Sequence, residues 1–286
     1  MLVGAADAPR ERLVTGDGIA PGNVATIPGR ILIDPGAPSM LLLSPEYAAR
    51  IGLRPGMLGM RYAVGPVSVT GSSAVTTIDT GSGPRKRRVS WSARPYAAGV
   101  DGVIGPGGLA EEVVRFVLRP PRPGEHKVAL PMVDAGGLMG GRAGLFARIE
   151  LGGQPLKVLF DLRRRRTVAT AGAGVRIAAA RTGRTEGAVE RAEIAFGIER
   201  RIRRLRLAAP LLIGPLAIDQ LFVRVADFGD ASIIADERDD PDEVVVTAGK
   251  KRDPDRDRLS VGLDQLDRCS SIVFDKRARQ ITLSCA

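Results

Sequence analysis

Residues 31–36 read Ile-Leu-Ile-Asp-Pro-Gly, and residues 158–163 read Val-Leu-Phe-Asp-Leu-Arg. Both stretches are short runs of apolar, strand-favouring residues that end in an aspartate. Each is followed, four or five residues later, by a second short apolar run, at residues 40–43 and 167–170. A pattern that recurs at a long interval indicates an internal repeat, so the chain is predicted to contain two related halves.

A short helix is expected after the second strand of each half. In the first half Ser44 is a good N-cap, Pro45 suits the first helical position, and Gly52 ends the helix. The counterpart in the second half is the alanine-rich stretch 173–181, which ends near Gly183. The two halves therefore agree in a strand, an aspartate, a second strand and a helix.

A glycine-containing segment matches a second time. Val-Ile-Gly at 103–105 precedes the apolar stretch 113–118, and Val-Gly at 261–262 precedes the apolar stretch 271–274. In both halves a leucine stands four residues after that glycine. The match predicts two β-rich lobes of one design, joined by a glycine-rich linker. The expected units are an N-terminal lobe at 1–133, a linker at 134–144 and a C-terminal lobe at 145–286.

Composition narrows the class of protein and the chemistry. The 286 residues are 44% hydrophobic and 26% charged, which is enough apolar material for a sizeable core. No apolar run is long enough to span a bilayer, so no membrane span is expected. The single histidine, His126, and two cysteines cannot form a tetrahedral zinc site without carboxylates, and there is no phosphate-binding loop. Neither a metal nor a cofactor is expected, and any catalysis would rest on carboxylates.

The order strand, Asp-x-Gly-Ala, strand, and Ser-Pro-Glu-x-Ala-x-x-Ile-Gly-Leu at 44–53 resembles the aspartic peptidases, especially the retropepsin-like ones. The segments at 103–105 and 261–262 are similar to the apolar-apolar-glycine segment of that family. The resemblance implies a mostly β, bilobal, pepsin-like fold of two related β-barrel-like lobes with short helices. It also implies that Asp34 and Asp161 form a dyad that activates water to hydrolyse a peptide or protein substrate.

The two expected active-site turns depart from the family pattern. Asp34-Pro35-Gly36 keeps the glycine but has no hydroxyl at Pro35, and Asp161-Leu162-Arg163 keeps only the aspartate. Two interpretations of the arginine run that begins at Arg163 stay open. If it points into the cleft, its charge favours ionised carboxylates and removes the shared proton; if it lies in solvent, screening removes that effect.

Two further stretches bear on the expected site. One, at residues 79–81, has the Asp-Thr-Gly sequence of the family turn, and the other, at residues 64–77, is expected to cover the cleft. Asp79-Thr80-Gly81 is followed by basic residues instead of a strand and helix, so we expect a polar turn there. Residues 64–77 are predicted to form the flap hairpin over the cleft, with Gly71, Ser72 and Ser73 at its middle.

Cys269 and Cys285 flank two apolar runs separated by a polar turn, which indicates a β-hairpin. A hairpin brings its outer ends together, so a disulfide is expected; two unrelated buried thiols are the alternative. A disulfide implies an oxidising compartment, and we expect a periplasmic or secreted protein. The first eight residues are too short for a signal peptide, and whether they are the remnant of one stays open.

The net charge of +10 is concentrated in arginine runs at 85–88, 163–166 and 200–206. These runs contain no aromatic side chains to stack on bases, so no specific nucleic-acid partner is expected. The function we expect is an aspartic endopeptidase, because both aspartates stand at matched positions of the repeat. The alternatives are an inactive pseudo-peptidase that binds extended peptides by β-pairing and a protein that binds anionic envelope polymers.

Overall fold

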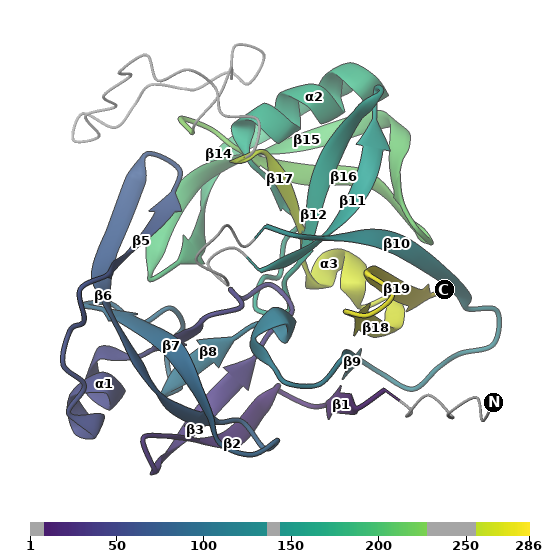
Figure 1. Ribbon diagram of the computed structural model, residues 1–286. Helices are drawn as coiled ribbons and strands as arrows, with labels where there is room; N and C mark the ends of the chain where they lie inside the picture. The colour runs from purple at the N-terminus through teal and green to yellow at the C-terminus, as the bar shows by residue number, and fades with distance from the viewer. Residues whose placement is uncertain (1–8, 136–143, 228–255) are drawn as a thin grey trace, which may run out of the picture.

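The structure is a computed structural model that describes residues 9–135, 144–227 and 256–286. The strands of these residues form two sheets, of 12 and 7 strands (Figure 1). The expectation of a mostly β fold with two lobes is confirmed. Residues 136–143 of the expected linker lie outside the described residues, and the boundaries of the lobes stay a prediction.

The N-terminal lobe is built on the seven-stranded sheet. Its strand order is β2-β3-β8-β4-β7-β6-β5. The elements of this lobe are β2 (Ile19–Val24), β3 (Ile27–Ile33), β4 (Leu41–Leu43), α1 (Pro45–Ile51), β5 (Gly59–Val64), β6 (Val67–Asp79), β7 (Arg85–Ser92), β8 (Gly102–Ile104) and the 3-10 turn η1 (Pro106–Gly108).

The C-terminal lobe has the same strand order. Its part of the larger sheet runs β11-β12-β17-β13-β16-β15-β14, and each strand occupies the place of its counterpart in the first lobe. The elements are β11 (Leu145–Leu151), β12 (Gln154–Phe160), β13 (Val168–Ala169), α2 (Ala171–Arg181), β14 (Gly183–Ala195), β15 (Ile198–Ile213), β16 (Leu216–Arg224), β17 (Arg258–Val261) and α3 (Leu263–Leu266).

The remaining five strands of the larger sheet join the halves of the chain, in the order β1-β9-β18-β19-β10. Strand β9 pairs with β18, and β10 pairs with β19 on one edge and with β11 on the other. Figure 1 shows these strands on the side of the molecule where the C-terminus lies. The five strands are β1 (Glu11–Val14), β9 (Val113–Val117), β10 (His126–Asp134), β18 (Cys269–Asp275) and β19 (Gln280–Cys285).

The strand before each aspartate pairs in parallel with the strand of the glycine segment. Ile33 lies opposite Ile104, and Phe160 lies opposite Val261. The next backbone N–H continues both ladders, because Asp34 N donates to Ile104 O at 3.1 Å and Asp161 N donates to Val261 O at 3.0 Å. Both aspartates therefore leave their sheets at equivalent points.

The helices follow from their caps. Ser44 Oγ accepts a hydrogen bond from Tyr47 N at 3.1 Å, and Gly52 ends α1 with a φ of 72° in the left-handed region. Helix α2 begins at Ala171, two residues before the predicted start, because Thr170 acts as its N-cap. No helix of the described residues is long and apolar enough to cross a membrane.

The expected flap hairpin exists, but its turn is not where the sequence predicted. Strands β5 and β6 are joined by Gly65 and Pro66, and Gly65 supplies the positive φ of 59° that a tight turn needs. Residues 71–73, comprising Gly71, Ser72 and Ser73, lie within β6; all three pair with β7, and Gly71 and Ser72 also pair with β5. The prediction that they form the tip is wrong, because β6 is a long strand that begins at Val67.

The literal turn match at Asp79 is a surface turn, as predicted. Asp79 ends β6, and its Oδ1 accepts hydrogen bonds from Gly81 N at 2.8 Å and Gly83 N at 3.1 Å. The carboxylate therefore holds its own turn, away from the other two aspartates.

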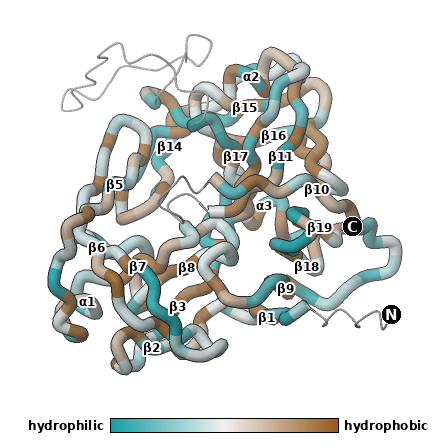
Figure 2. Tube along the Cα trace, in the orientation of Figure 1, coloured by the Kyte–Doolittle hydropathy of each residue, from teal (hydrophilic) through white to brown (hydrophobic). Residues whose placement is uncertain are grey.

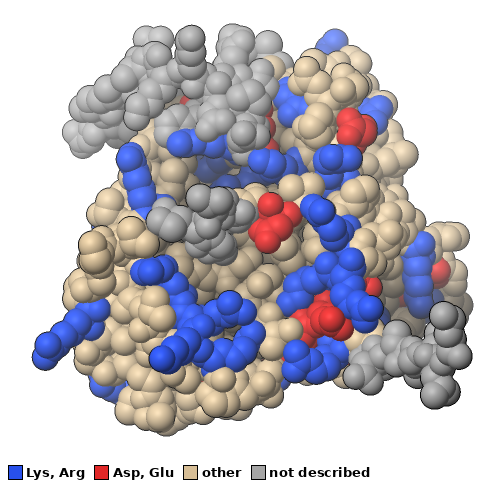
Figure 3. All heavy atoms as spheres, viewed as in Figure 1, with Lys and Arg blue, Asp and Glu red and all other residues tan. Residues whose placement is uncertain are grey.

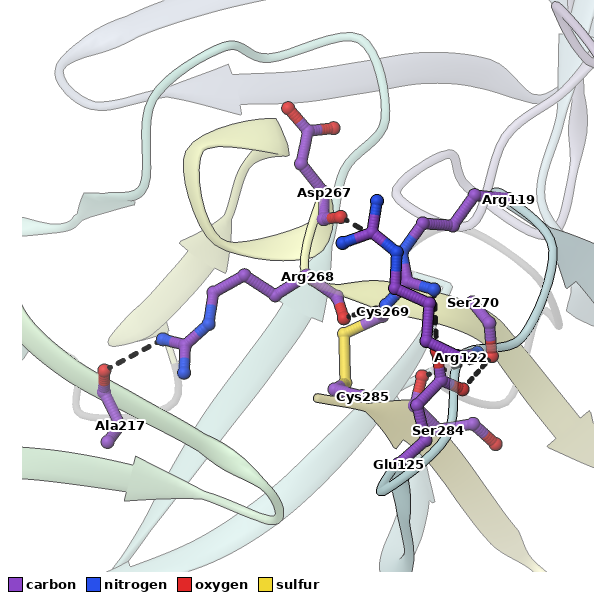
Figure 4. Close-up of a disulfide and its surroundings, with 10 residues drawn as sticks. All are labelled: Arg119, Arg122, Glu125, Ala217, Asp267, Arg268, Cys269, Ser270, Ser284 and Cys285. Carbon is purple, nitrogen blue, oxygen red and sulfur yellow. Dashed lines mark hydrogen bonds and ion pairs between the residues drawn. A yellow bond between two sulfur atoms is a disulfide. The ribbon is translucent and has the colours of Figure 1, made fainter.

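The predicted hairpin at 269–285 and its disulfide are confirmed. Cys269 and Cys285 are directly opposite each other in the ladder of β18 and β19 and are bonded through their sulfurs (Figure 4). Arg119 lies beside this end of the hairpin and donates to the backbone carbonyls of Asp267 and Arg268. The disulfide is fully buried and packs with the larger hydrophobic core.

Figure 2 shows hydrophobic stretches along the strands of both lobes.

Candidate dyad between the lobes

Asp34 and Asp161 lie together between the two lobes. The backbone of Gly36 is packed against both, because a Cβ built at Gly36 would lie 2.9 Å from Asp161 Cβ and 3.0 Å from Asp34 Oδ1. The two aspartates are only 2% and 1% exposed. Glycine is required at position 36 because any side chain there would separate the carboxylates or displace the turn.

The turn after each aspartate holds one carboxylate oxygen through the backbone. Gly36 N donates to Asp34 Oδ1 at 2.7 Å, and Arg163 N donates to Asp161 Oδ1 at 3.1 Å. Pro35, which is buried, and Leu162, which packs against the core, have no hydroxyl group to offer the carboxylates. The second oxygen of each aspartate remains for other partners.

An arginine lies beside each of those second oxygens: Arg164 donates a hydrogen bond to Asp161, while Arg163 forms an ion pair with Asp34 without a hydrogen bond. Arg164 Nε lies 2.5 Å from Asp161 Oδ2, and Arg163 Nε lies 4.0 Å from Asp34 Oδ2. The Arg164 and Arg163 side chains are 12% and 19% exposed. Arg163 and Arg164 point into the site, whereas Arg165 is exposed and Arg166 pairs with Glu190, so the first interpretation holds for half of the run. The expected loss of the shared proton does not follow, because the pKa of Asp34 is raised. Arg164, which makes the shorter contact, was not singled out by the sequence, because it stands within a run of four identical residues.

A threonine and an aspartate fix the loop that presents these arginines. Thr167 Oγ1 donates to Asp264 Oδ1 at 2.7 Å and accepts from Gly262 N at 3.0 Å, while Thr167 N donates to Asp264 Oδ2 at 3.1 Å. The carbonyl of Arg164 also accepts from Leu263 N at 2.8 Å. The loop is thus tied to the start of α3, which holds the Arg164 side chain against Asp161.

The two carboxyl groups have opposite pKa shifts. Burial and the neighbouring charge of Asp161 raise the pKa of Asp34 to about 7, against the opposing effect of Arg163. Burial would also raise the pKa of Asp161, but the Arg164 and Arg163 guanidiniums and their hydrogen bonds lower it below its usual value. Between the lowered pKa of Asp161 and about pH 7, Asp34 therefore keeps its proton while Asp161 is ionised.

Aromatic side chains from both lobes meet beside the dyad. Tyr62 on β5, Tyr96 in the loop after β7 and Phe196 in the turn between β14 and β15 make edge contacts, with ring centroids 5.1–5.8 Å apart. Arg163 Cζ lies 4.5 Å from the centroid of Tyr96. These residues belong to a hydrophobic cluster of their own, separate from the main core. The hairpin of each lobe thus contacts the other lobe, and the dyad is closed off from solvent.

The turn of the β5–β6 hairpin is also seated on the C-terminal lobe. A Cβ at Gly65 would lie 2.5 Å from Asp227 Oδ1, so the hairpin touches the loop after β16 directly. Tyr62, Tyr96, Phe196 and Asp227 were missed by sequence reasoning, because they come from four segments that only the folded chain brings together.

A cavity of about 250 Å³ adjoins Asp34 and Arg163 on the side of β1, β9 and α3. Its walls are mostly apolar and include Val14, Phe116 and Leu118. Within residues 9–135, 144–227 and 256–286, no group of three or more histidine, cysteine, aspartate or glutamate side chains could hold a metal ion. The groups that the site offers for binding or catalysis are the carboxyl groups of Asp34 and Asp161 and the guanidinium groups of Arg163 and Arg164, beside this cavity.

Comparisons with known proteins give little beyond this geometry. No protein-family model and no curated protein matches the chain. Among solved structures, the chain is similar to the retroviral protease-like domain of Ddi1 from Leishmania major. The identity is 18% and the TM-score is 0.25, and the match covers 31% of this chain and 71% of that one.

Proposed function

We propose that this protein is an aspartic-peptidase-like protein that binds extended peptides between its lobes and does not hydrolyse them. The observation that carries the proposal is the contact of Arg164 Nε with Asp161 Oδ2 at 2.5 Å. General-base activation of water needs a free carboxylate oxygen within hydrogen-bond reach of that water. Both oxygens of Asp161 are already engaged, one by Arg164 and one by Arg163 N.

Free sheet edges beside the cleft support peptide binding. Strands β5 and β14 each stand at the end of their strand order and, among the described residues, pair with a neighbour on one side only. Figure 1 shows both near the junction of the lobes. An extended peptide can add to such an edge through main-chain hydrogen bonds. Binding would require the contact between Tyr62 and Phe196 to open, so the closed arrangement describes the protein without its peptide.

Hydrolysis in acid is the second candidate, and a specific observation favours it. The opposite pKa shifts of Asp34 and Asp161 leave one carboxyl protonated and the other ionised, which is the division of roles that water-mediated peptide hydrolysis needs. This function would require Arg164 to leave Asp161 when substrate binds.

One experiment separates the candidates. The wild-type protein and the Asp161→Ala variant are incubated with a mixed peptide library from pH 3 to 7, and cleavage is followed by mass spectrometry. Binding of the unmodified peptides is measured in parallel by fluorescence polarisation. The same peptides with N-methylated backbones, which cannot pair as strands, serve as the comparison. We expect binding that N-methylation abolishes, and no cleavage. Asp79→Ala is the matched control, since its carboxylate holds only its own turn.

Each alternative result is informative. Cleavage by the wild type that is lost in Asp161→Ala would establish the hydrolytic function. Cleavage that survives in Asp161→Ala would refute the assignment of the pair. Retention of an anionic polymer without peptide binding would favour the third function, although Figure 3 shows the Lys and Arg side chains of one face in separate groups with acidic residues among them.

We further propose a periplasmic or secreted location and an origin of the two lobes in one repeated unit. The buried disulfide supports the first, because such bonds persist in oxidising compartments. The shared strand order of the lobes supports the second.

A further inference from the structure

A small cavity lies in the C-terminal lobe, beside Arg164. It is lined by Arg164, Arg224 and Arg258, together with the polar residues Thr170 and Ser260. Arg224 ends β16 and Arg258 begins β17, two strands that flank the short β13 in the sheet. The fold therefore brings three guanidinium groups to one small space.

Arg224 carries a buried donor without a partner. Its side chain is 6% exposed, and its NH2 nitrogen pairs with Asp227 Oδ2 at 3.0 Å. Its NH1 nitrogen is fully buried and has no hydrogen-bond partner in the described part of the chain. A buried donor left unsatisfied costs free energy, so this nitrogen calls for an acceptor.

The charges around the cavity do not balance. Arg164 pairs with Asp161 and Arg224 pairs with Asp227, while Arg258 has no ion pair within the described residues. Burial and the charges of Arg258, Arg164 and Arg200 lower the pKa of Arg224 to about 10, against the opposing effect of Asp227. Arg224 is nonetheless charged at neutral pH, so the described residues that line the cavity carry an excess of positive charge.

We propose that this cavity binds a single monatomic anion of the size of chloride, held by Arg164, Arg224 and Arg258. The free space accommodates about one water-sized particle, which admits a halide and excludes phosphate or sulfate. The anion would accept hydrogen bonds from the three guanidinium groups and offset the charge of Arg258, which has no ion pair within the described residues. This inference does not depend on the proposed peptide-binding function.

The direct test is the wild-type protein crystallised from sodium bromide, with anomalous diffraction measured at the bromine edge. We expect an anomalous peak within contact distance of the three guanidinium groups. In solution, bromide or chloride should raise the melting temperature saturably relative to gluconate at the same ionic strength, because gluconate is too large for the cavity.

Two variants sharpen the solution measurement. Arg258→Gln should lose most of the halide-dependent rise, whereas Arg176→Gln, an arginine on α2 that contacts only backbone carbonyls of Gln154 and Pro155, should keep it. A water molecule with no anomalous signal in the wild-type crystals, or an equal halide response in Arg258→Gln, would overturn the proposal. If Arg258→Gln does not fold, the crystallographic result alone decides.

Discussion

Replacing Arg164 by glutamine should destabilise the protein strongly at neutral pH and much less in acid. At about 4 Å between charge centres and an effective dielectric of 20, the pair with Asp161 is worth about 4 kcal/mol. Breaking a buried pair from one side typically costs about 3–5 kcal/mol, because it leaves an uncompensated charge. For a chain of this size the loss corresponds to a fall in melting temperature of roughly 5–15 °C.

The pH dependence follows from the shift of the Asp161 pKa. Its folded-state pKa lies below its unfolded value, so the pair contributes stability above the unfolded pKa, near 4. That contribution is lost as the pH falls through the folded pKa. What remains of the Arg164→Gln effect in acid is the hydrogen bond from Arg164 to Ile194 O, worth about 1 kcal/mol.

The assay is urea unfolding at constant ionic strength, from pH 2.5 to pH 7, with the disulfide intact. The matched control is Arg166→Gln in the same run, since Arg166 pairs with Glu190 at a half-exposed position and should cost less than about 1 kcal/mol. An Arg164→Gln loss that is equal at both ends of the pH range, or no larger than that of Arg166→Gln, would show that the ion pair does not hold the site together.

Asp34→Asn should remove a pH dependence whose sign is opposite to that of Asp161. The folded-state pKa of Asp34, about 7, lies above its unfolded value, so the free energy of unfolding of the wild type should fall by up to about 4 kcal/mol between pH 4 and 7. In the same urea series the variant should show no such fall. Replacing Cys269 and Cys285 together by alanine should cost about 3 kcal/mol, and thiol titration of the denatured, unreduced wild type should find no free thiol. Tyr62→Ala and Phe196→Ala should each speed proteolysis of the β5–β6 turn, and a double-mutant cycle should give a coupling of about 0.5–1.5 kcal/mol; additive effects would argue against the contact between lobes.

Local signals in the sequence were sufficient to predict three of the elements around the site. The strand before Asp34, the capped helix at 45–51 and the hairpin at 269–285 are determined by neighbouring residues, and the structure has all three. The opposed positions of Asp34 and Asp161 follow once each strand is placed beside its glycine segment.

Features that depend on tertiary packing were not predictable in the same way. In the arginine run, the bond from Arg163 N to Asp161 Oδ1 sets the backbone direction, and that direction decides which guanidinium reaches the carboxylate. The tip of the β5–β6 hairpin was misplaced because Gly71 and Gly65 are both turn-forming residues, and only pairing with β7 keeps Gly71 within a strand. No local signal links Tyr62 to Phe196, because their contact requires both lobes.

The interleaved strands that join the two halves impose an order on folding. Val114 of β9 pairs with Phe274 of β18, and Leu130 of β10 pairs with Ile281 of β19, so one edge of each of these strands stays unpaired until much later residues have left the ribosome. Contacts of such long range form slowly, and an unpaired strand invites association with other chains in the meantime. A chain interrupted before that last hairpin would expose the edges of β9 and β10 that β18 and β19 cover in the complete fold, which would make it an aggregation-prone fragment.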